Sequence, residues 1–126
     1  MKKDAYYFSH DSNARNDIKI KALIRNYGLE GYGRFWVIIE LLREQSDYQL
    51  QLDEFTYETL AEELRTGTDQ VENFIDNCIY KYKLFETNGE SFWSASLLTR
   101  MDKMNKIREK RIEAGKRSAE ARLKKK

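Results

Sequence analysis

Few side chains in this sequence are suited to catalysis. His10 is the single histidine; it lies beside Asp11, with Asp17 six residues further on. One histidine with loop carboxylates is a weak metal-ligand set, so we expect His10 to pack or to cap a helix. Cys78 has apolar neighbours at helical spacing, which predicts a buried thiol rather than a nucleophile. No nucleophile elbow, phosphate-binding glycine loop or paired-carboxylate motif appears, so we expect neither an enzyme nor a bound cofactor.

Positive charge is concentrated at the end of the chain. Residues 1–99 carry 11 Lys and Arg against 17 Asp and Glu, a net charge of −6, whereas residues 100–126 carry 12 against 4, a net charge of +8. Charge runs often only solvate a helix, but here the bases greatly outnumber the acids. We therefore expect the tail to bind DNA without sequence preference. The residues expected to contact DNA are Lys103, Lys106, Arg108, Lys110, Arg111, Lys116, Arg117, Arg122, Lys124, Lys125 and Lys126.

Helices must position these residues, because the chain has no proline and its apolar residues recur at helical spacing. A first helix is expected to start near Asn13 or Asn16 and to stop before Gly28, which suits a left-handed residue. A second helix, from about 30 to 45, is apolar on most sides and is predicted to form the centre of the core. Two more are expected: one capped by Asp53, and one capped by Thr68 and running over 69–81.

Short strands complete the pattern. Residues 48–52 alternate between apolar and polar side chains, which predicts a strand. Residues 84–87 and 91–93 flank Asn88-Gly89, which predicts a hairpin with positive φ at both turn residues. A last helix is expected from residue 95, packed through Leu97, Leu98, Met101, Met104 and Ile107 and solvated beyond.

This order of elements predicts a mainly α (α+β) fold: a winged helix-turn-helix with a small β-hairpin wing and a long basic C-terminal helix. We expect a winged-helix domain over 1–100 and a basic helical tail over 101–126.

The helix-turn-helix is acidic, which is unusual for a DNA-reading element. Between Asp53 and Ile79 there are eight acids and one base, Arg65, a net charge of −7. Phosphates are repelled by such a surface, so we expect it to contact proteins. Two alternatives stay open. One is a sequence-specific regulator that reads DNA with residues 69–83, and the other is an oligomerisation adaptor with no nucleic-acid role.

The cellular setting follows from simple counts. A single cysteine excludes an internal disulfide and suits a reducing cytoplasm. The longest apolar run, residues 35–39, is far shorter than a membrane span, and the N-terminus leads into no signal segment. We expect a cytoplasmic protein with no membrane partner.

A family resemblance is carried by two stretches of the sequence. They are residues 27–44 and Tyr7-Phe8-Ser9-His10-Asp11-Ser12-Asn13-Ala14-Arg15-Asn16-Asp17. Together with residues 94–101 and 114–122, they resemble the N-terminal domain of phage and prophage replisome-organiser and DnaD-like primosomal proteins. The resemblance implies a module that helps to assemble a replication-initiation complex on DNA, beside replication proteins such as a helicase loader, often through self-association. Family members commonly continue into a second, DNA-handling domain, and the resemblance implies that this domain is either absent or cut away here.

The resembling stretch also has a physical interpretation. Gly28, Gly31 and Gly33 are expected to let two helices turn sharply and approach closely. Tyr6, Tyr7 and Phe8 have no core position by periodicity, so we expect this aromatic arm to mediate self-association. The secondary phosphate contacts expected from the body are Lys2, Lys3, Arg15 and Arg34.

Overall fold

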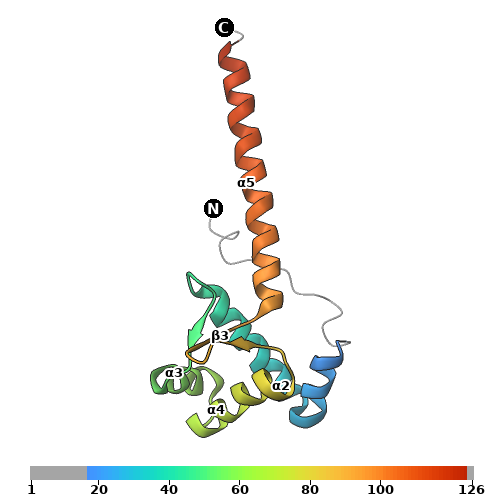
Figure 1. Cartoon of the computed structure of the whole chain (residues 1–126), viewed down its shortest axis with the longest axis vertical. Helices are drawn as coiled ribbons and strands as arrows, with labels where there is room; N and C mark the ends of the chain where they lie inside the picture. Colours follow the sequence, from blue (N-terminus) through green and yellow to red (C-terminus); the bar gives the residue numbers. More distant parts are fainter. Residues whose placement is uncertain (1–16, 125–126) are drawn as a thin grey trace.

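The computed structural model describes residues 17–124, with side chains to residue 122. In chain order the elements are α2 (Ile18–Glu44), β1 (Leu50–Gln51), α3 (Glu54–Leu64), α4 (Thr68–Asp76), a π-helical turn η2 (Asn77–Lys81), β2 (Glu86–Thr87), β3 (Ser91–Trp93) and α5 (Ala95–Lys124). Figure 1 shows a compact body from which α5 projects as a long rod. The predicted mainly helical α+β fold, with a hairpin wing and a long C-terminal helix, is confirmed.

The first helical region is bent at a glycine. Gly28 has φ 72° and ψ −167°, so α2 consists of two helical halves, as predicted from the Gly28 stop. The Asp17 carboxylate caps the first half by accepting hydrogen bonds from the backbone N–H groups of Lys19 (2.8 Å) and Ile20 (3.3 Å). The alternative starts near Asn13 and Asn16 lie outside the described residues.

Close approach after the bend depends on one further glycine. A Cβ atom on the buried Gly31 would overlap the Cβ atom of Tyr27, so no larger residue fits there without a shift. Gly33 is exposed with open space around it, and its predicted role in close approach is wrong.

The helix-turn-helix forms as predicted except at one cap. Asp53 caps α3 by accepting a 2.8 Å hydrogen bond from the Thr56 N–H. Arg65 ends α3 in the left-handed region at φ 54°. The prediction that Thr68 caps the next helix is wrong: Thr68 is its first helical residue, and Gly67 precedes it. The Gln70 side chain reaches back and accepts a 3.3 Å hydrogen bond from the Gly67 N–H. Gln70, and not Thr68, therefore provides the side-chain hydrogen bond at the N-terminus of α4.

The strands form one small antiparallel sheet in the order β1-β3-β2. Leu50 pairs with Phe92, and Thr87 pairs with Phe92 from the other side. The predicted strand over 48–52 is thus confirmed in a shorter form. In the hairpin turn only Gly89 has positive φ (94°), because the register makes Gly89 and Glu90 the two central residues. The prediction of positive φ at Asn88 as well is wrong.

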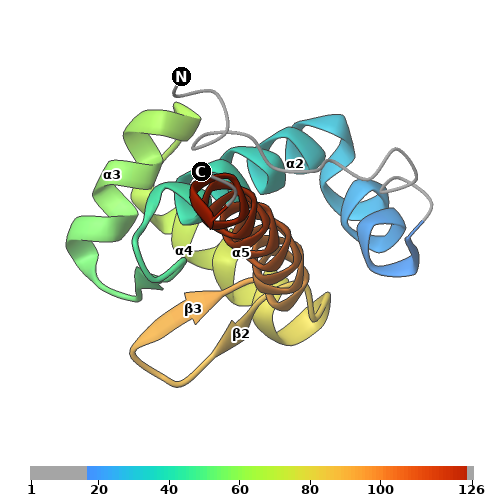
Figure 2. The ribbon, with the colours of Figure 1, turned by 90° about the horizontal axis from the view of Figure 1, so that it is seen from above.

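The core lies between α2 and the other elements (Figure 2). The predicted central helix contributes Phe35, whose ring stacks on Phe85 at a centroid distance of 5.5 Å. The full predicted stripe of α4 and η2 is buried, namely Val71, Phe74, Ile75, Cys78, Ile79 and Tyr82. Two side-chain hydrogen bonds of 2.7 Å join the η2 region to the first half of α2: Asn26 Nδ2 donates to the Tyr82 hydroxyl, and Asn77 Nδ2 donates to the Tyr27 hydroxyl.

Candidate nucleic-acid interface

Among the residues that the structure describes, the first turns of helix α5 anchor it in the body. Ser94, itself buried, caps it by accepting a 3.2 Å hydrogen bond from the Leu97 N–H. Leu97 and Met101 are buried in the core, and Met104 packs against its edge. Ile107 is 51% exposed, so the predicted packing stripe ends one turn earlier than expected.

Every side chain from Lys106 to Arg122 is exposed. This stretch of 17 residues extends about 25 Å at about 1.5 Å per residue. Figure 1 shows it leaving the body on the side away from α3 and α4. The structure therefore carries the cations predicted to bind DNA, from Lys106 to Arg122, on a solvent-exposed rod. The side chains of Lys124, Lys125 and Lys126, also predicted to bind DNA, lie outside the described residues.

Two ion pairs lie along the rod. Lys106 Nζ is 3.0 Å from Asp102 Oδ2, and Arg117 Nη2 is 3.4 Å from Glu113 Oε1. Both pairs span one helical turn and are solvent-exposed, so each stabilises the helix by only about 0.3–0.5 kcal/mol. The carboxylates thus support the helix without burying its positive charge.

The outer surface of the helix-turn-helix is acidic, as predicted. Asp69, Glu72 and Asp76 of α4 are all exposed. Partial burial raises the pKa of the nearby Tyr57 phenol, and the carboxylates of Glu72 and Asp76 raise it further. This surface therefore has the negative potential that repels a phosphate backbone.

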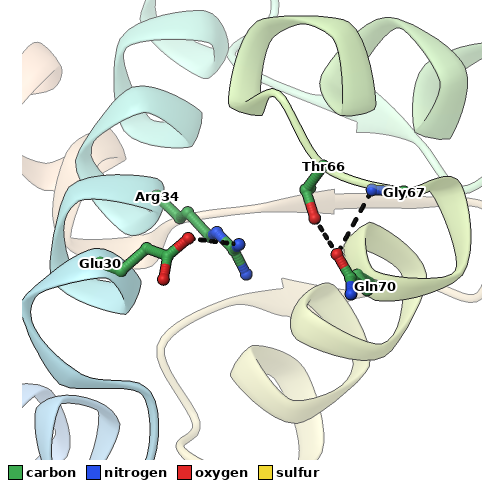
Figure 3. Close-up of polar contacts among 5 residues, drawn as sticks. All are labelled: Glu30, Arg34, Thr66, Gly67 and Gln70. Carbon is green, nitrogen blue, oxygen red and sulfur yellow. Dashed lines mark hydrogen bonds and ion pairs between the residues drawn. The ribbon is translucent and has the colours of Figure 1, made fainter.

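Arg34 was predicted as a secondary phosphate contact, and its surroundings do not favour that role. Its side chain is 18% exposed, and its Nη2 is 2.8 Å from Glu30 Oε1. Figure 3 shows this pair on α2 together with the turn between α3 and α4, where the Thr66 hydroxyl and the Gly67 N–H both donate to Gln70 Oε1. The Arg34 guanidinium is thus largely covered and already neutralised by a carboxylate. Several residues named in the sequence analysis lie outside the described residues. They are the predicted phosphate contacts Lys2, Lys3 and Arg15, the aromatic arm Tyr6, Tyr7 and Phe8, and His10.

An open groove of about 420 Å³ was not predicted from the sequence. Its floor is apolar, with Ile20, Phe35 and Leu97 among the lining residues, and its rim carries Lys19, Lys83 and Glu86. It forms where the start of α2, the second half of α2, residues 83–86 and the first turns of α5 meet. Four segments that are separated in the sequence make it, so no local pattern could have revealed it.

The predicted burial of the Cys78 thiol is confirmed. Cys78 is fully buried, and that burial raises the pKa of its thiol. Within residues 17–124 no group of three or more His, Cys, Asp or Glu side chains is placed to hold a metal ion. None of the helices described here has the length and apolar character needed to cross a membrane.

Comparison with known proteins identifies a family. The family model described as "Lin1244/Lin1753-like, N-terminal" matches residues 7–97, which include α2 to β3 and the first turn of α5. Searches of curated proteins and of solved structures gave no significant match. The match spans well over half of the chain, and the protein therefore belongs to the Lin1244/Lin1753-like N-terminal family.

Proposed function

We propose that this chain is a non-catalytic, cytoplasmic DNA-replication initiation module. Its winged helix makes protein contacts and self-associates, while α5 provides DNA affinity without sequence preference. The observation that carries the DNA-binding part is the separation of charge between an acidic helix-turn-helix and an exposed basic rod. The replication part rests on the resemblance of residues 7–17 and 27–44 to replisome-organiser and DnaD-like proteins.

The DNA-binding part is tested by truncation. Removing residues 106–126 keeps Met104 and every buried residue of α5, so the body should keep its helical circular-dichroism signal and its unfolding transition. The truncated chain should lose retention of duplex DNA in a gel shift at low salt. Binding by the full chain should weaken steeply as salt rises, because counterion release drives it. A folded truncated chain that binds as well as the full chain would show that the assignment to the tail is wrong.

A sequence-specific regulator is the alternative that the helix-turn-helix shape suggests. Footprinting separates the two functions. A regulator protects one defined site, whereas the proposed module coats DNA without a preferred site. Protection of one short sequence at low protein concentration would favour the regulator.

A further inference from the structure

The four acidic residues of α5 lie along one side of the helix. At about 100° per residue, Asp102, Glu109, Glu113 and Glu120 fall within about 40° of one another around the helix axis. All four are exposed. We call this side the acidic face. Lys106 and Arg117, which pair with Asp102 and Glu113, project within about 60° of its centre, as does Lys116.

The opposite side of the described part of α5 carries cations and no acid. Lys103, Arg108, Arg111 and Arg122 all project at least about 100° away from the centre of the acidic face. We call this side the basic face. Between Arg111 and Arg122 it presents small residues, Ala114, Gly115 and Ser118. Long cationic side chains therefore flank a narrow strip over which another molecule can approach the helix backbone.

The composition of α5 favours a duplex over a single strand. Single-stranded nucleic acids are held largely by stacking of bases on aromatic side chains. From Ala95 to Lys126 there is no Phe, Tyr, Trp or His. A straight cationic helix instead suits the B-DNA major groove, which at about 12 Å wide admits an α-helix. The A-form RNA major groove is too deep and narrow for this.

We propose that α5 lies in the major groove of B-form DNA with its basic face towards the phosphates and its acidic face towards solvent. This inference rests on the proposed DNA-binding function and adds the contacting face, the groove and the duplex form. The exposed rod of about 25 Å spans about seven base pairs at about 3.4 Å each. The ion pairs on the outer side then serve to hold the helix straight while the basic face binds.

Two full-length variants of equal charge test the inference. The first changes Lys103, Arg111 and Arg122 to Gln on the basic face. The second changes Lys106, Lys116 and Arg117 to Gln beside the acidic face. Each removes three cations, so net charge alone predicts the same loss for both. Fluorescence anisotropy with a 20-base-pair duplex, over a range of salt concentrations, measures both affinity and salt dependence.

The basic-face variant should bind at least tenfold more weakly at low salt. The slope of log K against log salt should become shallower by about 2–3, since each lost phosphate contact contributes about 0.9. The other variant should lose less than threefold, with a slope change below about 1. Circular dichroism should show equal helicity in the two variants. If either has reduced helicity, both are remade with Ala in place of Gln. The basic-face variant then changes Lys103, Arg111 and Arg122 to Ala, and the other changes Lys106, Lys116 and Arg117 to Ala.

Other outcomes overturn the inference while leaving the proposed function in place. Equal losses in the two variants would show that total charge, and not one face, governs binding. Equal or tighter binding of the full chain to single-stranded DNA or to double-stranded RNA would exclude the groove. Binding to vesicles that contain anionic lipid, lost in the basic-face variant while its affinity for DNA is retained, would assign the basic face to a membrane surface. Failure of the proposed function itself is seen separately, as undiminished DNA binding by the chain that lacks residues 106–126.

Discussion

Gly28 and Gly31 together determine how the two halves of α2 meet. The positive φ of Gly28 turns the chain, and the absence of a side chain at Gly31 leaves room for Tyr27. The Tyr27 ring then lies edge-on to Phe74 at a centroid distance of 5.1 Å, and its hydroxyl accepts a hydrogen bond from Asn77. Two residues without side chains thus allow a partly buried tyrosine to pack against the core.

The thiol of Cys78 makes stability depend on pH. Burial raises its pKa in the folded chain, whereas the unfolded chain has the ordinary value of about 8.5. Its contribution to stability is therefore complete below about pH 8.5 and is lost as the pH rises above that value. The free energy of unfolding should fall by up to about 1.4 kcal/mol per pH unit in that range. Urea titrations between pH 7 and pH 10 measure it.

The matched variant is Cys78→Ala. It should be less stable at pH 7 by about 1 kcal/mol, and its free energy of unfolding should depend less on pH above 8.5. A thiol reagent should modify the wild-type chain only as fast as the chain unfolds. Immediate labelling of the native protein would contradict the burial of this side chain.

Caps with a side-chain acceptor could be predicted from single residues, and caps that depend on a neighbour could not. Asp53 was correctly predicted because its carboxylate alone satisfies an N–H of α3. Thr68 was wrongly predicted because Gln70, three residues beyond Gly67, reaches back to the start of α4. Asn88 was wrongly given positive φ because the hairpin register, which pairs Thr87 with Phe92, places Gly89 and Glu90 at the centre of the turn and so moves the turn by one position.

At the scale of elements, α4 has two faces with different roles. Its apolar side is fully buried, and its outer side exposes Asp69, Glu72 and Asp76. Changing these three acids to Asn or Gln should leave the affinity for duplex DNA unchanged or raise it up to a few fold, because a repulsive charge is removed. Anisotropy at low salt measures the change.

The control for this variant removes three acids elsewhere on the body. Glu40, Glu44 and Glu90 are exposed and lie outside the helix-turn-helix. Changing them to Gln should alter affinity by the same small factor, because the repulsion acts at long range. A clear loss of binding in the α4 variant alone would instead assign DNA recognition to that helix.

Helical periodicity predicted the elements well because each has one strongly apolar side. It succeeded for α4 and η2, where all six stripe residues are buried. It overestimated the packed part of α5, since Ile107 continues the pattern but the body ends at Met104. The position of each cation on the rod was readable from the sequence. The covering of Arg34 was not, because it depends on how α2 packs in the folded body.

For the whole molecule, we predict self-association through the aromatic arm. Tyr6, Tyr7 and Phe8 precede the described residues, and helical periodicity gives them no position in the core. Removing residues 1–9 should convert an oligomer to a monomer, because aromatic side chains are enriched at interfaces. Light scattering gives the mass, and circular dichroism should show unchanged helicity.

Two results would contradict this prediction. One is a full-length chain that stays monomeric at high protein concentration. The other is a truncated chain that loses its helical signal, which would place the arm in the core of its own body.

The projecting rod also makes the molecule a large electric dipole. A net charge of −6 over residues 1–99 is joined to one of +8 over residues 100–126, and most of the second lies on an element that extends away from the body. In the field of a polyanion, such a dipole rotates before contact is made, with its positive end leading. Steering of this kind raises encounter rates and weakens as salt is added. The protein should therefore approach DNA with the tip of α5 first and its acidic body trailing.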